Sequence, residues 1–310
     1  MKTFYCLTLL LSLLVFQIVR SNSTDNQSGK LTEIAKYSPP KVPIVFDRNE
    51  GKMRYLAANF WSDFDFSGAT SYDTTNIESC YASYISILNQ LSIDESTIYI
   101  KQLATSLTHS LFYANRFIRL ADKYLYHPNS PLRNEDCYLY FIESIISFAK
   151  LPFADSVMYC NRLNLLKKNR VGYIACNFAF SLESSKTVSL YEVSSPFVLL
   201  LFYDPDCETC RATIKSLSHN EMIDKLQKNS MLKVLSICPD GYSQQWFSFR
   251  TNIPPSWING YDKDVSIRKW QMYDLKAMPT LYLLNGRKEV VVKDGTVDSI
   301  VEYLRGIESR

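Results

Sequence analysis

Cys207 and Cys210 are separated by two residues, a spacing at which one thiol can reach the other. They follow residues 197–203, a continuous apolar run typical of a strand buried on both faces, and they precede a helix-like stretch. The N-terminus of a helix offers unpaired N–H groups and a partial positive charge, which stabilise a thiolate. The pattern predicts thiol–disulfide exchange, in which Cys207 attacks and Cys210 resolves the mixed disulfide. Asp206 is the predicted N-cap of the helix.

A structural disulfide and a zinc site are alternatives to a redox-active pair. A structural disulfide requires no strand-to-helix context, and it stays open. A zinc site requires a second Cys or His pair at ligand spacing, which Cys238 and His219 do not provide. A peroxiredoxin is excluded: Pro205 and Thr209 match part of its motif, but its reactive cysteine would then stand at Ala212.

The elements that must position the cysteines are predicted from residue 170 onward. Strands are expected over 173–182, 187–193, 197–203, 232–237, 280–284 and 289–293, and helices from the cysteines to about 227, over 265–273 and over 297–307. The first two strands form a hairpin, and Asn285-Gly286 predicts a two-residue hairpin turn between the last two. This order predicts an α/β fold, in which a mixed sheet of parallel and antiparallel strands has helices on its faces.

Residues from about 50 to 168 show the helical period instead. The apolar stripes are Ile77, Tyr81, Tyr84, Ile85, Leu88 and Leu91, then Ile100, Leu103, Leu107, Leu111, Ala114, Ile118, Ala121 and Leu125. Asp94 is expected to begin the second stripe, Asn134 to cap a further helix, and Pro152 to start another that ends near residue 168. We predict four or five helices whose stripes form the core of a bundle rather than a ligand groove.

The composition excludes several classes of protein. A chain of 310 residues with 46% hydrophobic residues is globular and long enough for two domains, and a formal charge of +3 provides no polybasic surface for nucleic acid. His109 and His127 are isolated, so no metal site is expected. Cys6 lies within the first thirty residues, and buried packing is predicted for the five cysteines that remain in the mature chain, Cys80, Cys137, Cys160, Cys176 and Cys238. Because five is odd, at least one stays free or pairs outside the chain.

The first thirty residues predict export. Lys2 precedes a nearly continuous apolar run over 4–19, and small residues suit cleavage after Ser21. The run is short for a transmembrane span, although an uncleaved signal that tethers the protein to the membrane stays open as the alternative. We therefore expect a signal peptide over 1–21 and a flexible leader over 22–45.

Two segments of the C-terminal half resemble exported bacterial thioredoxin-like proteins of the TlpA/ResA type: residues 203–210, with the two cysteines, and residues 278–284, which begin Met278-Pro279-Thr280. Proline is accepted at the start of a central strand but not inside it. The resemblance implies a thioredoxin-like domain over 170–310. In it Pro279 is cis and close to the cysteines, and Met278 offers backbone hydrogen bonds to an extended substrate.

The same resemblance implies a thiol–disulfide oxidoreductase that acts on protein thiols and disulfides in the periplasm of a Gram-negative bacterium. It implies no metal or organic cofactor beyond the redox-active disulfide Cys207–Cys210. A membrane-embedded thiol reductant relay is the implied electron donor.

The sequence departs from thioredoxins proper at two positions. Leu201 stands where they carry a buried acid, and Asp206 stands where they commonly carry Trp. Glu208 is therefore the candidate for proton transfer. Asp204, Asp206 and Glu208 place negative charge around Cys207, which opposes the helix terminus in stabilising a thiolate. We expect a reducing or neutral redox couple rather than a strong oxidant.

The helical half, residues 46–168, is similar over 59–66 and 121–135 to an uncharacterised helical domain that commonly precedes thioredoxin modules in Gram-negative bacteria. This match predicts architecture rather than activity. The alternative function is a binding or scaffold protein, in which the helical domain recognises a partner and the thioredoxin fold is non-catalytic. Residues 257–262 are expected to pack beside the active site, with Trp257 as a candidate recognition residue.

Overall fold

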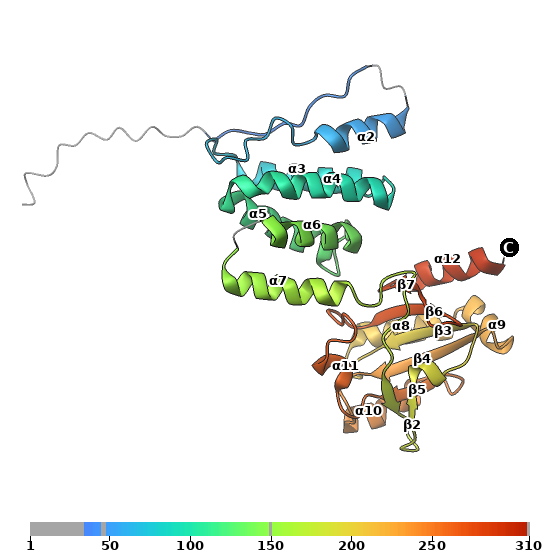
Figure 1. Ribbon diagram of the computed structural model, residues 1–310. Coiled ribbons are helices and arrows are strands. Elements are labelled where there is room, and N and C mark those ends of the chain that lie inside the picture. Colours follow the sequence, from blue (N-terminus) through green and yellow to red (C-terminus); the bar gives the residue numbers. More distant parts are fainter. Residues whose placement is uncertain (1–33, 45–47, 149–150, 309–310) are drawn as a thin grey trace, which may run out of the picture.

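The N-terminal half of the chain is a stack of helices, and the C-terminal half is a mixed sheet with helices on its faces (Figure 1). The computed structural model describes residues 34–44, 48–148 and 151–308. The predicted signal peptide, residues 1–21, lies outside these ranges. None of the helices in these ranges is both long enough and apolar enough to span a bilayer.

The described part of the N-terminal half contains six α-helices. They are α2 Asn49–Asn59, α3 Thr74–Leu88, α4 Ile93–Ser106, α5 Leu111–Ala121, α6 Glu135–Phe148 and α7 Phe153–Leu166. The prediction of four or five helices is wrong, because α2 carries no predicted apolar stripe and because the second apolar stripe is divided between α4 and α5. Ser110 is extended (φ −147°, ψ 116°) and separates them, while side chains on both sides of the break still face one core.

Side-chain caps mark the starts of α4 and α6, and a proline directly precedes α7. Ser92 caps α4 and forms a capping box with Glu95, so the helix begins at Ile93, one residue before the predicted Asp94. Asn134 accepts a hydrogen bond from the N–H of Cys137 (2.9 Å) at the start of α6, as predicted. Pro152 directly precedes α7, which confirms the predicted start.

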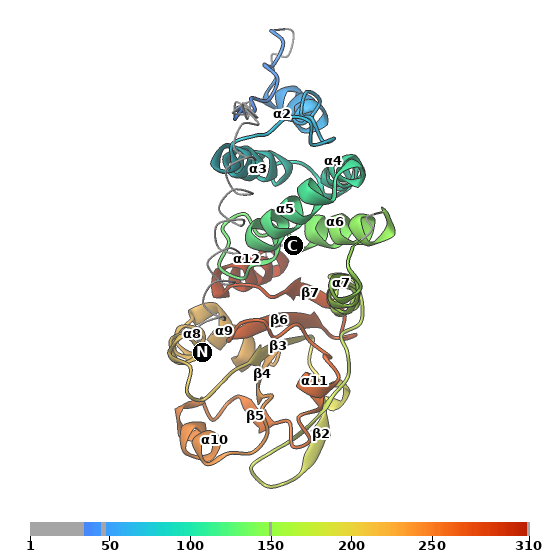
Figure 2. The same cartoon turned by 90° about the vertical axis from the view of Figure 1, so that its left-hand side faces the viewer.

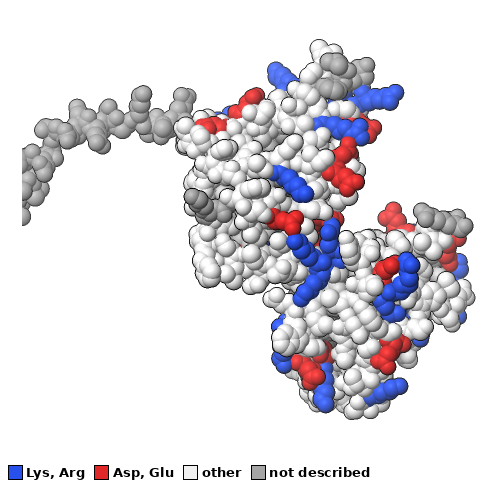
Figure 3. All heavy atoms as spheres, viewed as in Figure 1, with Lys and Arg blue, Asp and Glu red and all other residues white. Residues whose placement is uncertain are grey.

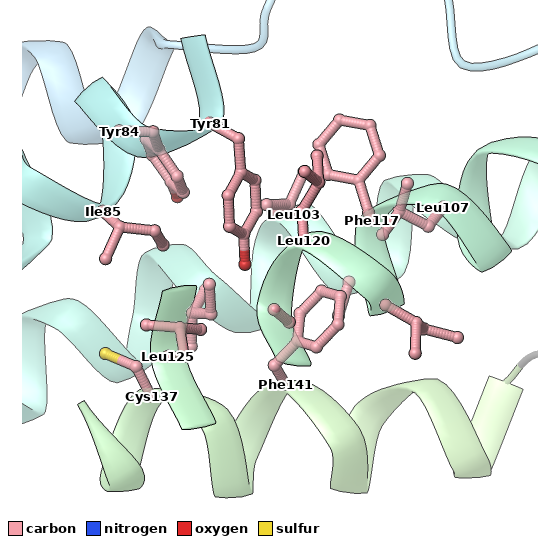
Figure 4. Close-up of a cluster of buried hydrophobic side chains, with 14 of the residues drawn as sticks. Tyr81, Tyr84, Ile85, Leu103, Leu107, Phe117, Leu120, Leu125, Cys137 and Phe141 are labelled. Carbon is pink, nitrogen blue, oxygen red and sulfur yellow. The ribbon is translucent and has the colours of Figure 1, made fainter. Parts of the chain in front are cut away.

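The predicted apolar stripes form the core of the helical half. Tyr81, Phe117, Leu125 and Phe141 are each fully buried, and their side chains point toward one another between the helices (Figure 4). Burying a large apolar side chain contributes roughly 1.5–3 kcal/mol, so this cluster is a main source of stability for the bundle.

Part of the predicted flexible leader packs against this core. The side chain of Tyr37 is buried and stacks on Trp61, with ring centroids 5.3 Å apart. Its N–H donates to the Asn76 Oδ1 atom (2.7 Å), and Ala35 forms an isolated parallel bridge with Tyr72. The prediction of a flexible leader is therefore wrong for residues 35–37, where the burial of Tyr37 and the bridge of Ala35 hold the chain in place.

Seven strands form one sheet in the C-terminal half, and the sheet is mixed, as predicted, although only six strands were expected. They are β1 Ala179–Ser181, β2 Thr187–Ser189, β3 Phe197–Phe202, β4 Leu232–Cys238, β5 Ile258–Tyr261, β6 Thr280–Asn285 and β7 Val290–Lys293. Their order across the sheet is β2-β1-β5-β4-β3-β6-β7. The central strand β3 pairs parallel with β4 and antiparallel with β6, so the end of β3 lies beside the start of β6.

Helices cover the sheet unequally. The larger layer consists of α8 Glu208–Ser218, α9 Glu221–Lys228, α10 Gln244–Phe249 and α12 Val297–Glu308, and the opposite face carries α11 Ser266–Lys269 (Figure 2). Leu199 and Leu201 of β3 pack under the larger layer, whereas Leu200 packs on the opposite face. This alternation explains why the whole strand is apolar.

Several elements of this half differ from the prediction: α10 was not predicted, and the strand expected over 173–182 is limited to β1. The helix expected to reach residue 227 is two helices, because Asn220 caps α9 by accepting from the N–H groups of Met222 (3.1 Å) and Ile223 (3.2 Å). The helix expected over 265–273 is limited to α11, and the strand β5 was not predicted.

The turn between β6 and β7 is longer than the predicted two residues. The Asn285 side chain accepts from the N–H groups of both Arg287 and Glu289 (3.0 Å each), and Lys288 adopts a left-handed conformation (φ 64°). The turn therefore spans residues 286–289, since the amide side chain of Asn285 stabilises a wider loop.

A cluster of charged side chains joins the two halves, and we refer to it as the interdomain charge cluster. Its members are Arg133, Glu135, Asp274, Lys276, Lys293 and Asp294. The Lys276 ammonium lies 2.9 Å from Asp274 and 3.5 Å from Glu135, and Arg133 pairs with Asp294 at 2.6 Å. Basic and acidic side chains also lie side by side on the surface where the halves meet (Figure 3).

Candidate active site

Cys207 is the N-cap residue of α8, directly after the turn that follows β3. Its backbone is extended (φ −82°, ψ 118°), and its sulfur accepts a hydrogen bond from the N–H of Cys210 (3.2 Å). The prediction that Asp206 caps this helix is wrong. Asp206 is exposed, and its N–H donates to the Asp204 side chain (2.9 Å) within the preceding turn. The helix terminus therefore acts directly on the Cys207 sulfur.

The two thiols differ in exposure. Both are free; Cys207 is half-buried and Cys210 is fully buried. Burial, together with the hydrogen bond to Cys207, raises the pKa of the Cys210 thiol. Cys210 therefore stays protonated at neutral pH, while Cys207 is the sulfur that another molecule can reach.

The Met278–Pro279 peptide bond is cis, as predicted, and its loop lies against the cysteines. The Cys207 sulfur lies 3.6 Å from the carbonyl oxygen of Met278. This approach follows from the antiparallel pairing of β3 and β6, in which Phe202 opposes Thr280. Residues 71 positions apart in the sequence thus form one site.

The remaining predicted site residues lie at different depths. Glu208 is exposed at the first position of α8, so its proposed part in proton transfer stays a prediction. Leu201, which stands where thioredoxins proper carry a buried acid, is fully buried in the apolar layer under the helices. Trp257 is also buried in that layer, so it is a core residue and the prediction of a surface recognition role is wrong.

The sequence interpretation missed a groove beside the cysteines. The groove has a volume of about 750 Å³, lies between α8 and α10, and begins at Pro205 and Asp206. One wall of the groove is a face of α8, and the four-residue spacing of Arg211 and Lys215 indicates that they share this face. The other wall is α10, and the groove was missed because this helix was not predicted.

The five other cysteines within the described ranges are free thiols. Cys80, Cys137 and Cys238 are buried, as predicted, whereas Cys176 is half-buried and Cys160 is exposed on α7. The packing prediction is therefore wrong for Cys160. Within the described ranges, no group of three His, Cys, Asp or Glu side chains is arranged to hold a metal ion.

The comparisons with known proteins agree with this architecture. A crystal structure of a thioredoxin-like protein from Bacteroides caccae is 35% identical, with a TM-score of 0.84, and the match covers 88% of this chain and 99% of that one. The chain belongs to the thioredoxin-like proteins. Residues 17–169 match the family described as Domain of unknown function (DUF5106), which is the helical half. No curated protein matches the chain.

Two further solved structures match the C-terminal half. The C-terminal domain of an uncharacterized protein from Bacteroides fragilis is 38% identical over 44% of this chain and 98% of that one, with a TM-score of 0.44. A thiol:disulfide interchange protein from Bacteroides sp. is 17% identical over 46% of this chain and 91% of that one, with a TM-score of 0.39.

Proposed function

We propose that this protein is a thiol–disulfide oxidoreductase that acts on protein thiols and disulfides in the reducing direction. The observation that carries the proposal is the position of the half-buried Cys207 sulfur. It lies at a helix N-terminus, 3.2 Å from the N–H of Cys210 and 3.6 Å from the carbonyl of Met278. The first contact stabilises a thiolate, and the second places that sulfur beside main-chain groups that an extended substrate can bind.

The reaction follows from the two thiols. The Cys207 thiolate attacks one sulfur of a substrate disulfide, the substrate S–S bond breaks, and the departing substrate thiolate takes up a proton. Cys210 then loses its proton and attacks the Cys207 sulfur. A Cys207–Cys210 disulfide forms and the second substrate thiol is released, so two electrons have passed to the substrate.

Because the pKa of Cys210 is raised by burial, the second step requires a group that accepts its proton. Glu208 is our candidate for this group, from its place in the Cys-x-x-Cys segment. Asp204, Asp206 and Glu208 place negative charge around the site, which favours a reducing couple over a strongly oxidising one.

We also propose that the protein works in the cell envelope of a Gram-negative bacterium, exported through residues 1–21. In that compartment the disulfide form must be reduced again, and a membrane-embedded thiol relay is the proposed electron donor. Two electrons and two protons from the relay restore both thiols. The chemistry requires no metal or organic cofactor.

Cys210→Ser is expected to trap the substrate. The variant keeps the attacking sulfur but has no resolving thiol, so the mixed disulfide on Cys207 accumulates. Non-reducing electrophoresis of protein purified from cells after acid quenching should show adducts that disappear on reduction. The double variant Cys207→Ser/Cys210→Ser is the control and should show none. If Cys210→Ser repeatedly trapped nothing beyond that control, an exchange role would be contradicted.

A further inference from the structure

The groove between α8 and α10 begins at the active site. Pro205 and Asp206, which directly precede Cys207, form its near end, and Asn252 lies among its lining residues beyond α10. α8 and α10 both lie in the larger helix layer, on the same side of the sheet (Figure 2). A polypeptide whose cysteine reacts with Cys207 therefore has a depression of about 750 Å³ beside it.

One wall of this groove is basic. Arg211 and Lys215 are spaced by four residues, so the helical period places them on one face of α8, and His219 is the C-cap residue that directly follows the helix; all three line the groove. Within residues 34–44, 48–148 and 151–308, no ion pair involves any of the three. The like charges of Arg211 and Lys215 repel one another at this spacing, and no ion pair within the described ranges offsets that repulsion.

Arg211 is held in place at the end nearest the cysteines. Its guanidinium donates to the carbonyl oxygen of Pro205 (2.9 Å) and lies over the ring of Phe249, 5.5 Å from the centroid. The wall formed by α10 presents the side-chain amides of Gln244 and Gln245, which are uncharged hydrogen-bond donors and acceptors. Asp206, at the active-site end, is the one acidic side chain among the lining residues.

We propose that this groove binds an acidic segment of the substrate polypeptide next to its reacting cysteine. The inference rests on the proposed function and adds a substrate class to it. Lys215 follows Cys207, the N-cap residue of α8, by eight residues, or about 12 Å at 1.5 Å per residue. An extended peptide covers that distance in about four residues. The recognised carboxylates therefore lie within about four residues of the substrate cysteine.

The test compares two peptides, each with one cysteine capped as a neutral 2-pyridyl disulfide. In one, Glu occupies the second, third and fourth positions on both sides of the cysteine; in the other, Gln does. The release of thiopyridone by the reduced protein gives a second-order rate constant. Each rate constant is divided by the second-order rate constant for the reaction of the same peptide with 2-mercaptoethanol. This ratio removes differences in the intrinsic reactivity of the two peptide disulfides.

The Glu peptide is expected to react about 3- to 10-fold faster than the Gln peptide at low salt, as two or three exposed charge pairs allow. The ratio should fall toward one in Arg211→Gln/Lys215→Gln and on raising the salt concentration. Lys228→Gln, which removes a lysine of α9 outside the groove, should keep the wild-type ratio. A ratio of one in the wild type would overturn the inference and leave the proposed function intact, as long as both peptides react.

Binding is measured separately with the same peptides carrying Ser in place of Cys. The Glu peptide should shift the His219 ring resonances of the wild-type protein more strongly than the Gln peptide does, and the difference should be lost in Arg211→Gln/Lys215→Gln. If binding is selective but neither reactive peptide reacts, the proposed function fails and the groove assignment stands. Arg211 and Lys215 could instead only stabilise α8. In that case Arg211→Gln/Lys215→Gln would lower the melting temperature but leave the difference between the Glu and Gln peptides unchanged, which would also overturn the inference.

Discussion

Cys207→Ser is expected to lower kcat/KM for insulin reduction by about 10³-fold or more, with dithiothreitol as the electron donor. The variant removes the one sulfur at the site that is both accessible and located at the helix N-terminus. Cys210 cannot replace it, because it is fully buried and its pKa is raised.

The fold should tolerate this substitution. Serine is among the preferred N-cap residues, and its hydroxyl can accept the hydrogen bond that the Cys207 sulfur now accepts from the N–H of Cys210. The melting temperature of Cys207→Ser should therefore stay close to that of the wild type. Cys160→Ser, at an exposed cysteine of the helical half, is the matched control and should retain full activity. Substantial activity in Cys207→Ser would contradict the assigned nucleophile.

Lys276→Ala is expected to destabilise the protein by about 3–5 kcal/mol, the range for removing one partner of a buried ion pair. Only 11% of the Lys276 side chain is exposed, and its ammonium is the cation between Asp274, Glu135 and Asp294. Without this ammonium, three carboxylates from both halves of the chain lie close together, and only Arg133 and Lys293 of the described residues remain to neutralise their charge. Urea unfolding followed by circular dichroism measures the change.

Lys167→Ala provides the comparison. Lys167 pairs with Glu143 at 2.6 Å, but both side chains are about 40% exposed or more, so its loss should cost about 1 kcal/mol or less. Equal destabilisation by the two variants would contradict the structural role of the interdomain charge cluster.

The same cluster predicts the pH at which stability is lost. Burial lowers the pKa of Lys276, but the neighbouring carboxylates Asp274, Glu135 and Asp294 outweigh it, and the pKa lies above its usual value of 10.5. A pKa that is higher in the folded state than in the unfolded state stabilises the fold below the unfolded value. The contribution of Lys276 is therefore present below pH 10.5 and lost as the pH rises above it.

The cluster also connects the helical half to the active site. Asp274 and Lys276 directly precede the segment that leads to Met278, and Tyr126 of the helical half donates a hydrogen bond to Asp274 (3.2 Å). Through this hydrogen bond the helical half contacts the segment that leads to Met278, whose carbonyl oxygen lies beside the Cys207 sulfur.

The features that the sequence predicts well are those with a local physical signature. A strand buried on both faces is apolar at every position, which locates β3 and with it the cysteines at its end. The apolar stripes of the helical half locate its core for the same reason, because side chains three and four residues apart share a helix face.

The features that were missed depend on contacts between distant segments. Strand β5 is four residues long, and pairing with β4 on one side and β1 on the other makes it a strand. The N-cap of α8 falls on Cys207 rather than Asp206 because the end of β3 fixes where the helix begins, and both residue types can accept the capping bond. The interdomain charge cluster joins residues more than 130 positions apart, which no local pattern indicates.

The reduction potential of the Cys207–Cys210 couple tests the central claim most directly. Purified protein would be equilibrated in dithiothreitol or glutathione redox buffers, quenched with acid, and the fraction of free thiols measured by alkylation and mass spectrometry, with Cys160→Ser as the background. We predict a value near that of thioredoxin, about −270 mV. A value near that of the oxidant DsbA, about −120 mV, would contradict the reducing direction, and the lack of any reversible couple would contradict the oxidoreductase function itself.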